Sequence, residues 1–190
     1  MTKDDTMTDQ HRFPPITDAD WPAQVADLRD GFAGRLNVYR TMAHNPDLLQ
    51  AWAPLRQHVV IDNALGQQLS EVTILRTGHH LGSSYEWDQH VHRARACGMT
   101  DARIGSIRGP LSDMEQDDAT IARAVDELFE TKRLSQDTQQ ALIALVGEKG
   151  MFDVIATVGF YSTLGYILNS CDTPLDDDIA AELAENPFAG

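Results

Sequence analysis

The sequence of 190 residues predicts an all-α protein with about seven or eight helices. Apolar residues recur every three or four positions in several segments, which is the spacing that places side chains on one face of a helix. The alternation of apolar and polar residues that is typical of a β-strand is found nowhere in the chain. Hydrophobic residues make up 42% of the sequence, which is enough for one compact domain with a buried core.

Residues 1–30 are predicted to form an N-terminal arm that is partly disordered. Residues 1–13 are polar, and they lack the apolar stretch of a secretory signal peptide. Trp21 is expected to pack against the body of the fold, because large aromatic side chains are usually buried. Between residues 27 and 40, apolar side chains at helical spacing predict a short helix or an ordered segment.

The first long helix is predicted to begin at Asn45-Pro46, because asparagine suits the N-cap and proline suits the first turn. Its apolar stripe includes Trp52, which is expected to pack in the core. Pro54 lies inside the stripe and predicts a kink or an early end, since proline cannot donate a backbone hydrogen bond. Residues 61–69 are expected to form a linker.

Two helices that meet at a glycine follow the linker, over residues 71–81 and 84–97. The first is expected to stop at Gly82, which tolerates the left-handed conformation that often ends a helix. Ser83 or Ser84 suits the N-cap of the second helix, because a short hydroxyl can accept an unpaired backbone N–H. The sequence therefore predicts a helical hairpin in the middle of the chain.

Four further helices are predicted in the second half of the chain. Capping residues and apolar spacing place them over residues 101–107, 117–131, 135–150 and 151–169, with Gly150 ending the third. The last is apolar nearly all round, but Asp153 near its start argues against a membrane span. We expect it in the core or in a subunit interface. The acidic residues after Cys171 predict a loose surface tail over residues 173–190.

The composition narrows the class of partner. A net charge of −14 argues against a nucleic-acid partner, which needs a basic patch, and against an anionic membrane surface. The two cysteines, Cys97 and Cys171, are too few and too far apart in sequence for a disulfide framework. The expected compartment is therefore a reducing cytoplasm, and the expected partner is a small-molecule substrate.

The predicted hairpin carries the residues that are best suited to chemistry. Glu86 and His90 are four residues apart, so their side chains share one face of the second helix. Glu71, in the first helix, can join them if the two helices pack antiparallel. Carboxyl groups beside an imidazole form the set that a proton-transfer site needs, because histidine titrates near neutral pH and a carboxylate orients it. The sequence contains no phosphate-binding loop, dinucleotide fingerprint or nucleophile elbow.

The order Glu71, Ser83, Glu86, His90 resembles the carboxymuconolactone decarboxylase family, which includes the alkyl-hydroperoxidase D proteins. In the peroxidase branch, a glutamate is followed after twelve residues by a Cys-x-x-Cys pair, and a histidine lies four residues after the second cysteine. Glu71, Ser83, Glu86 and His90 have the same intervals of twelve, three and four residues. The similarity extends from about residue 36 to residue 169. It implies an all-helical domain, over residues 31–172, that is built round a helical hairpin and assembles as a homo-oligomer, a trimer or a hexamer.

The chain departs from the peroxidase branch at the two redox positions and looks like the Cys-free branch. Ser83 and Glu86 stand where that branch has cysteines, and neither side chain can form the disulfide that the peroxidase reaction requires. Cys97 lies eleven residues beyond Glu86 along the same helix and is a poor substitute. Dithiol peroxidase activity is therefore not expected.

The resemblance implies a cofactor-free lyase that decarboxylates a small carboxylated lactone or a related intermediate of aromatic catabolism. His90 is expected to donate or relay a proton, with Glu71 or Glu86 orienting it. Arg76 is a candidate for binding the substrate carboxylate or for neutralising the glutamates. Ser83, as a hydrogen-bonding group, and the aromatic pair Tyr85 and Trp87 are further candidates for the substrate pocket, although aromatic residues in such positions more often serve packing.

Three alternatives stay open. The chain can be a peroxidase-like antioxidant protein if Cys97 or Cys171 is reactive, or a non-catalytic oligomer that binds a ligand. A metal site built from His79, His80, Glu86 and His90 has suitable ligand types but no recognised spacing, so no metal is expected.

Overall fold

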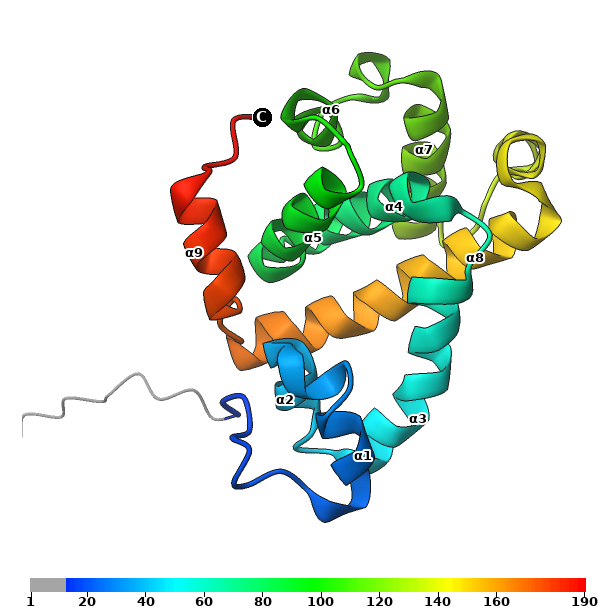
Figure 1. The fold of residues 1–190 in the computed structure, drawn as a ribbon. Helices are drawn as coiled ribbons and strands as arrows, with labels where there is room; N and C mark the ends of the chain where they lie inside the picture. Colours follow the sequence, from blue (N-terminus) through cyan, green and yellow to red (C-terminus); the bar gives the residue numbers. More distant parts are fainter. Residues whose placement is uncertain (1–12) are drawn as a thin grey trace, which may run out of the picture.

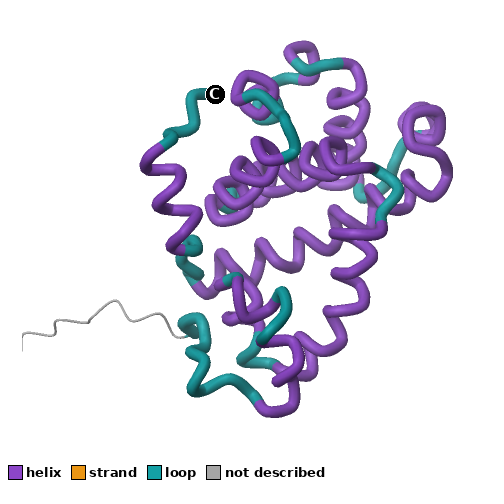
Figure 2. Tube along the Cα trace, in the orientation of Figure 1, coloured by secondary structure: helices purple, strands orange, loops and turns teal. Residues whose placement is uncertain are grey.

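The computed structural model describes residues 13–190, and every regular element in that range is a helix (Figure 2). The predicted all-α class is therefore confirmed. Residues 1–12, which belong to the stretch expected to be disordered, lie outside the described residues. None of the helices described is both long enough and apolar enough to cross a bilayer.

The N-terminal third forms short helices and one longer helix. They are α1 (Ala26–Arg29), α2 (Asn37–Met42) and α3 (Pro46–Arg56), with short 3₁₀ turns before α1 and before α2. The Asn45 side chain caps α3 by accepting from the Leu48 N–H, as the sequence predicts.

Pro54 does not end α3, although the sequence predicts a kink or an early stop there. Proline removes only its own N–H from the helix, and the Gln57 N–H bonds to the carbonyls of Ala53 and Pro54. The chain continues as a π-helical segment, η3 (Gln57–Asp62). The expected linker over residues 61–69 is therefore wrong, because only residues 63–65 separate this segment from the next helix.

The remaining helices build the other two thirds of the molecule. They are α4 (Gly66–Leu81), α5 (Ser84–Ala96), α6 (Asp101–Ser106), α7 (Gln116–Thr131), α8 (Gln136–Cys171) and α9 (Asp177–Glu185). The long helix α8 crosses the middle of the molecule, with α1–α3 on one side and α4–α7 on the other (Figure 1).

The predicted helical hairpin is α4 and α5. Gly82 adopts a left-handed conformation, φ 60°, and its N–H closes the last turn of α4 on the carbonyls of Gly78 and His79. Ser83 caps α5, accepting from the Glu86 N–H at 3.5 Å. The chain therefore reverses over two residues, which lays α5 back along α4.

α8 is divided near its start, but not where the sequence predicts. The break lies at Gly147, with φ 75° and ψ 174°, rather than at Gly150. Gly150 is helical and buried, and a Cβ there would meet the Val146 side chain at 2.5 Å. Close packing, rather than a helix end, therefore explains that glycine.

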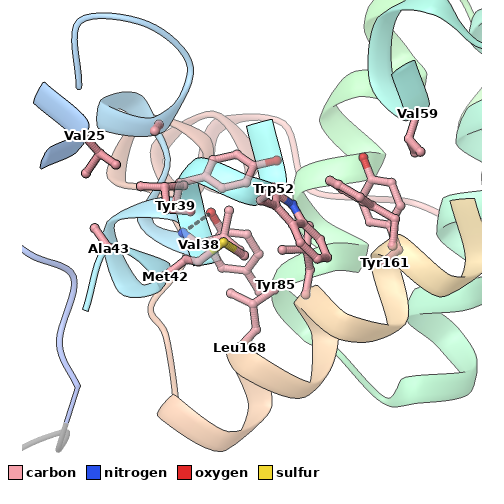
Figure 3. Close-up of a cluster of buried hydrophobic side chains, with 14 of the residues drawn as sticks. Val25, Val38, Tyr39, Met42, Ala43, Trp52, Val59, Tyr85, Tyr161 and Leu168 are labelled. Carbon is pink, nitrogen blue, oxygen red and sulfur yellow. Dashed lines mark hydrogen bonds between the residues drawn. The ribbon is translucent and has the colours of Figure 1, made fainter. Parts of the chain in front are cut away.

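Two apolar clusters lie on the two sides of the hairpin and α8. The first joins α1–α3 to the C-terminal half of α8 and includes Tyr39, Trp52 and Tyr161 (Figure 3). In this cluster Trp52 stacks on Phe160, with ring centroids 4.4 Å apart. The second joins α4 and α5 to α6 and α7, with Trp87, Ile104 and Ile121 buried in it. The hairpin is thus fixed from both sides, because its two faces contribute to different cores.

The C-terminal segment is not the loose tail that the sequence predicts. It contains α9, and Asp176 in front of α9 is only 5% exposed. The Asp176 carboxylate accepts hydrogen bonds from the Asn37 backbone N–H at 2.7 Å, from the Tyr85 hydroxyl at 2.6 Å and from the Gln89 amide. A buried carboxylate needs such partners, so this residue anchors the segment to α2 and α5.

Candidate functional site

The hairpin brings Glu71, Glu86 and His90 together. The Nδ1 atom of His90 lies 2.6 Å from a carboxylate oxygen of Glu71, on α4. The Nε2 atom on the other side of the ring lies 3.5 Å from a carboxyl oxygen of Glu86, one turn earlier on α5. The imidazole therefore stands between two carboxyl groups.

The surroundings of His90 fix its orientation. The ring is buried and packs edge-on against Tyr161 of α8, with centroids 5.1 Å apart. A carboxylate can only accept hydrogen bonds, so a hydrogen bond to a Glu71 carboxylate places a proton on Nδ1 of His90. In the neutral ring, the lone pair of Nε2 then points toward Glu86.

Glu86 is the most perturbed carboxyl group in this set. It is 3% exposed, and this burial raises its pKa to about 8; nearby Arg93 lowers the pKa in part and Glu71 raises it further. Its Oε1 atom is buried without a hydrogen-bond partner among the described residues. Glu86 is therefore largely neutral at pH 7 and able to give up a proton.

A glycine on α4 allows this close packing. A Cβ at Gly78 would lie 3.3 Å from the Cβ of Glu86, which is tighter than an ordinary contact. The absence of a side chain at Gly78 thus lets α5 approach α4 where Glu86 projects.

Two hollows that share lining residues lie beside these residues, and we call them the inner and the outer hollow. The inner hollow, about 20 Å³, is bordered by Glu86, His90 and Arg56. The outer hollow, about 380 Å³, is bordered by Glu71 and Cys97. Val60, Arg93 and Tyr161 border both and form their boundary. The outer hollow has the size of a small-ligand pocket, whereas the inner one has room for a group of a few atoms.

The lining residues that sequence reasoning missed include two arginines and two tyrosines: Arg56, Arg93, Tyr39 and Tyr161. Only Arg93 gave a signal in the sequence, because it lies three residues after His90 and seven after Glu86, on the same face of α5. The other three come from α3, α2 and α8. Burial raises the pKa of Tyr39 to about 12 and that of Tyr161 well above its usual value, so both phenols stay protonated.

Arg76 lies elsewhere. Its guanidinium forms two hydrogen bonds with Asp126 of α7, at 2.7 and 2.8 Å, and two with the carbonyls of Ile107 and Gly109. It therefore joins α4 to α7 and to the segment that follows α6. It borders neither hollow, so the structure does not bring it to the glutamates or to a substrate bound beside them.

The remaining predicted site residues divide between the two faces of α5. Tyr85 borders the inner hollow while its hydroxyl donates to Asp176. Ser83 and Trp87 border a separate surface hollow on the other side, where the Arg108 guanidinium lies 3.6 Å from the Trp87 ring. The structure thus brings Tyr85, but not Ser83 or Trp87, to the same cavity as His90.

The two cysteines do not have reactive surroundings. Cys97 borders the outer hollow, but burial and the charge of Glu71 raise the pKa of its thiol. Burial and Asp172 also raise the pKa of the Cys171 thiol. Raised pKa values leave little thiolate, which is the form that attacks a peroxide. In the described part of the chain, no three His, Cys, Asp or Glu side chains are arranged as metal ligands.

Comparisons with known proteins place part of the chain beside one family and its fold beside one solved protein. The model of the carboxymuconolactone decarboxylase family matches residues 46–127, which include Glu71, Ser83, Glu86 and His90. No curated protein matches the chain in sequence. Among solved structures, the chain is similar to the debrominase Bmp8, in the structure of a cysteine-to-alanine variant in complex with 2,3,4-tribromopyrrole. The TM-score is 0.74 and the sequence identity 15%, and the alignment covers 94% of this chain and 98% of the debrominase chain.

The apo form of the same debrominase gives a TM-score of 0.73 and 14% identity, over 94% of this chain and 99% of the other. At such low identity the likeness shows the fold alone. The helical fold predicted from the sequence is confirmed on this basis.

Proposed function

We propose that the chain is a cofactor-free lyase that removes CO2 from a small carboxylated lactone or a related intermediate of aromatic catabolism. The proposal starts from the match of residues 46–127 to the model of the carboxymuconolactone decarboxylase family. The observation that carries the proposal is His90 standing between Glu71 and a neutral Glu86 at the edge of a cavity. A neutral carboxyl group beside an imidazole is suited to protonating carbon near pH 7.

The chemistry balances with one proton. The bond between the substrate carbon and its carboxylate breaks, and the electron pair enters the unsaturated lactone as a delocalised enolate. CO2 leaves, and the Glu86 carboxyl group protonates the ring carbon. Each turnover consumes one proton and releases one CO2.

His90 and Glu71 supply the route that restores the proton on Glu86. Nε2 of His90 faces Glu86, and Nδ1 faces Glu71, which borders the larger hollow and is the more exposed of the two carboxyl groups. Once Glu86 has lost its proton, the neutral ring can carry its proton on Nε2 instead of Nδ1. A proton taken up at Glu71 then moves to Nδ1 as Nε2 gives its proton to Glu86, which restores the starting tautomer. Tyr161 packs on the ring and holds it in line with both carboxyl groups.

Incubation with carboxylated unsaturated γ-lactones tests the proposal. The wild-type chain is expected to release CO2, and His90→Ala is expected to abolish release, because the proton route is interrupted. His92→Ala is the matched control, since His92 lies on the same helix and pairs with Glu182 of α9 instead. Equal release by the wild type and His90→Ala would refute the mechanism.

We also propose that the chain forms a homo-oligomer. Support comes from large apolar side chains on α8 that face solvent, with Phe152 65% and Tyr166 60% exposed. Sedimentation is expected to give a mass of several chains, and Phe152→Asp with Tyr166→Asp is expected to reduce it. A wild-type monomer at assay concentrations would contradict the proposal.

A further inference from the structure

We propose that Arg56 and Arg93 are the anion-recognition residues of this site, which hold a carboxylate of the substrate at the inner hollow. The identity of the substrate rests on the proposed function. The anion site itself does not, because it can be tested with a ligand that undergoes no reaction.

The first support is that neither arginine has an acidic partner. No salt bridge joins Arg56 or Arg93 to a described acidic residue, although the charge of Arg93 acts on the nearby Glu86. Arg56 interacts with the Tyr39 hydroxyl, and its Nε atom is buried without a hydrogen-bond partner. Arg76 and Arg103, by contrast, each form two hydrogen bonds with one aspartate. Buried donors are normally paired, so the unpaired Nε of Arg56 at the hollow fits a ligand.

The second support is the charge balance beside the hollow. Glu86, the acid that borders the inner hollow, is largely neutral at pH 7. Arg56 and Arg93 border the same hollow, whereas Glu71 borders only the outer one, so the guanidinium groups have no ionised carboxyl group opposite them there. A carboxylate on the ligand would offset this positive charge, although the chain as a whole carries a net charge of −14.

The third support is that Arg56 is already held in place. Its guanidinium lies 4.2 Å from the Phe32 ring and 5.9 Å from the Tyr39 ring. Such packing orients the planar group before a ligand arrives, and a planar guanidinium matches the two oxygens of a carboxylate. Arg93 borders both hollows, so it can reach the same anion while the ring of the ligand occupies the outer one.

The bound carboxylate is one that the substrate keeps. An ion pair with the departing carboxylate would stabilise the substrate more than the transition state, in which that charge moves away. A retained carboxylate is held equally in both states. Arg56→Gln is therefore expected to raise KM and leave kcat within a few-fold of the wild type.

Protection of Cys97 from iodoacetamide tests the site without turnover, provided that excess reagent and a long incubation at pH 7 compensate for the small thiolate fraction. Cys97 borders the outer hollow, and Cys171 at the end of α8 does not, so peptide mass spectrometry provides an internal control. The probe is 5-oxotetrahydrofuran-2-carboxylate, a saturated lactone that cannot delocalise electrons and so keeps its carboxylate. It is expected to protect Cys97 and not Cys171, and neutral γ-butyrolactone is expected to protect neither.

The variants decide the role of the arginines. Arg56→Gln and Arg93→Gln are expected to need about 10- to 100-fold more of the carboxylate for half-protection, the range for a lost charge-assisted hydrogen bond. Arg93→Lys keeps the charge and is expected to recover part of the loss. Arg35→Gln removes the same charge from an exposed position and is expected to behave as wild type.

Two results would overturn the inference: equal protection of the wild type and both glutamine variants, or no protection of the wild type by the carboxylate. Thermal melts of each variant confirm that it is folded. If the anion binds through Arg56 and Arg93 but no unsaturated lactone releases CO2, the anion site stands and the proposed lyase fails. If CO2 is released with a KM that both substitutions leave unchanged, the proposed lyase stands and the anion site fails.

Discussion

Two polar clusters lie on different faces of α4, and they differ in how completely their groups are paired. In the first, Arg76 and His80 of α4 both bind Asp126 of α7, and Arg76 also donates to two carbonyls. In the second, Glu71, His90 and Glu86 lie beside a hollow, and Glu86 has an oxygen without a partner. We refer to them as the closed cluster and the open cluster.

The carboxyl groups of the two clusters respond to burial in opposite directions. Burial raises the pKa of Asp126, but hydrogen bonds from Arg76 and His80 outweigh it, so the net shift is downward. Burial raises the pKa of Glu86 to about 8, and Arg93 offsets this only in part. A paired acid contributes to the stability of the fold, whereas an unpaired acid that keeps its proton is available for chemistry.

The largest effect is expected from Glu86→Gln. The amide has the shape of the neutral acid but no proton to transfer, so kcat is expected to fall about 10²- to 10⁴-fold. Wild-type kcat is also expected to fall above pH 8, where Glu86 loses its proton. Steady-state CO2 release measures both. Glu148→Gln, at an exposed position, is the control and is expected to leave kcat unchanged. If kcat of Glu86→Gln stayed within tenfold of the wild type, the unpaired acid of the open cluster would have no special role in chemistry.

The next effect is on stability and concerns the closed cluster. Arg76→Leu leaves the Asp126 charge with His80 alone and is expected to lower the free energy of unfolding by about 3–5 kcal/mol. Arg56→Gln, which breaks no ion pair, is expected to change it by less than about 1 kcal/mol. Urea denaturation measures both. Equal losses would show that the two arginines are held in the same way.

The smallest effect is a difference in the pH dependence of stability. Because the pKa of Glu86 is raised from 4.5 to about 8, its contribution is fully present below pH 4.5 and is lost as the pH rises through 8. Asp126 has a lowered pKa, so its contribution is present above the unfolded value and is lost only in acid. Between pH 5 and 9 the wild type is expected to lose stability. Glu86→Gln is expected to flatten that slope, and parallel curves would argue against the raised pKa.

The three residues of the open cluster could be predicted because their placement is local. Glu86 and His90 share a helix face by spacing alone, and the turn at Gly82 and Ser83 lays that face against the helix that carries Glu71. Arg76 was misplaced although the spacing contained the answer. It lies five residues after Glu71, about 140° round the helix, and so faces α7 instead.

The corrections to the fold have a common origin in long-range contacts. The acidic tail is ordered because Asp176 accepts hydrogen bonds from α2 and α5, which no local pattern in residues 173–190 indicates. Gly150 was assigned a helix end because glycine often occupies one, yet it lies where the Val146 side chain leaves no room for a Cβ. The true break is at Gly147, only three residues away, where φ is positive.

The sequence by itself determined the all-helical class, the hairpin and the meeting of two acids with one imidazole, because backbone periodicity and capping act over a few residues. Only the tertiary structure decided that Arg56 from α3, Tyr39 from α2 and Tyr161 from α8 surround them. The same packing removed water from Glu86 and left it unpaired. Burial depends on helices far apart in the chain, and burial is what raises the pKa of this carboxyl group.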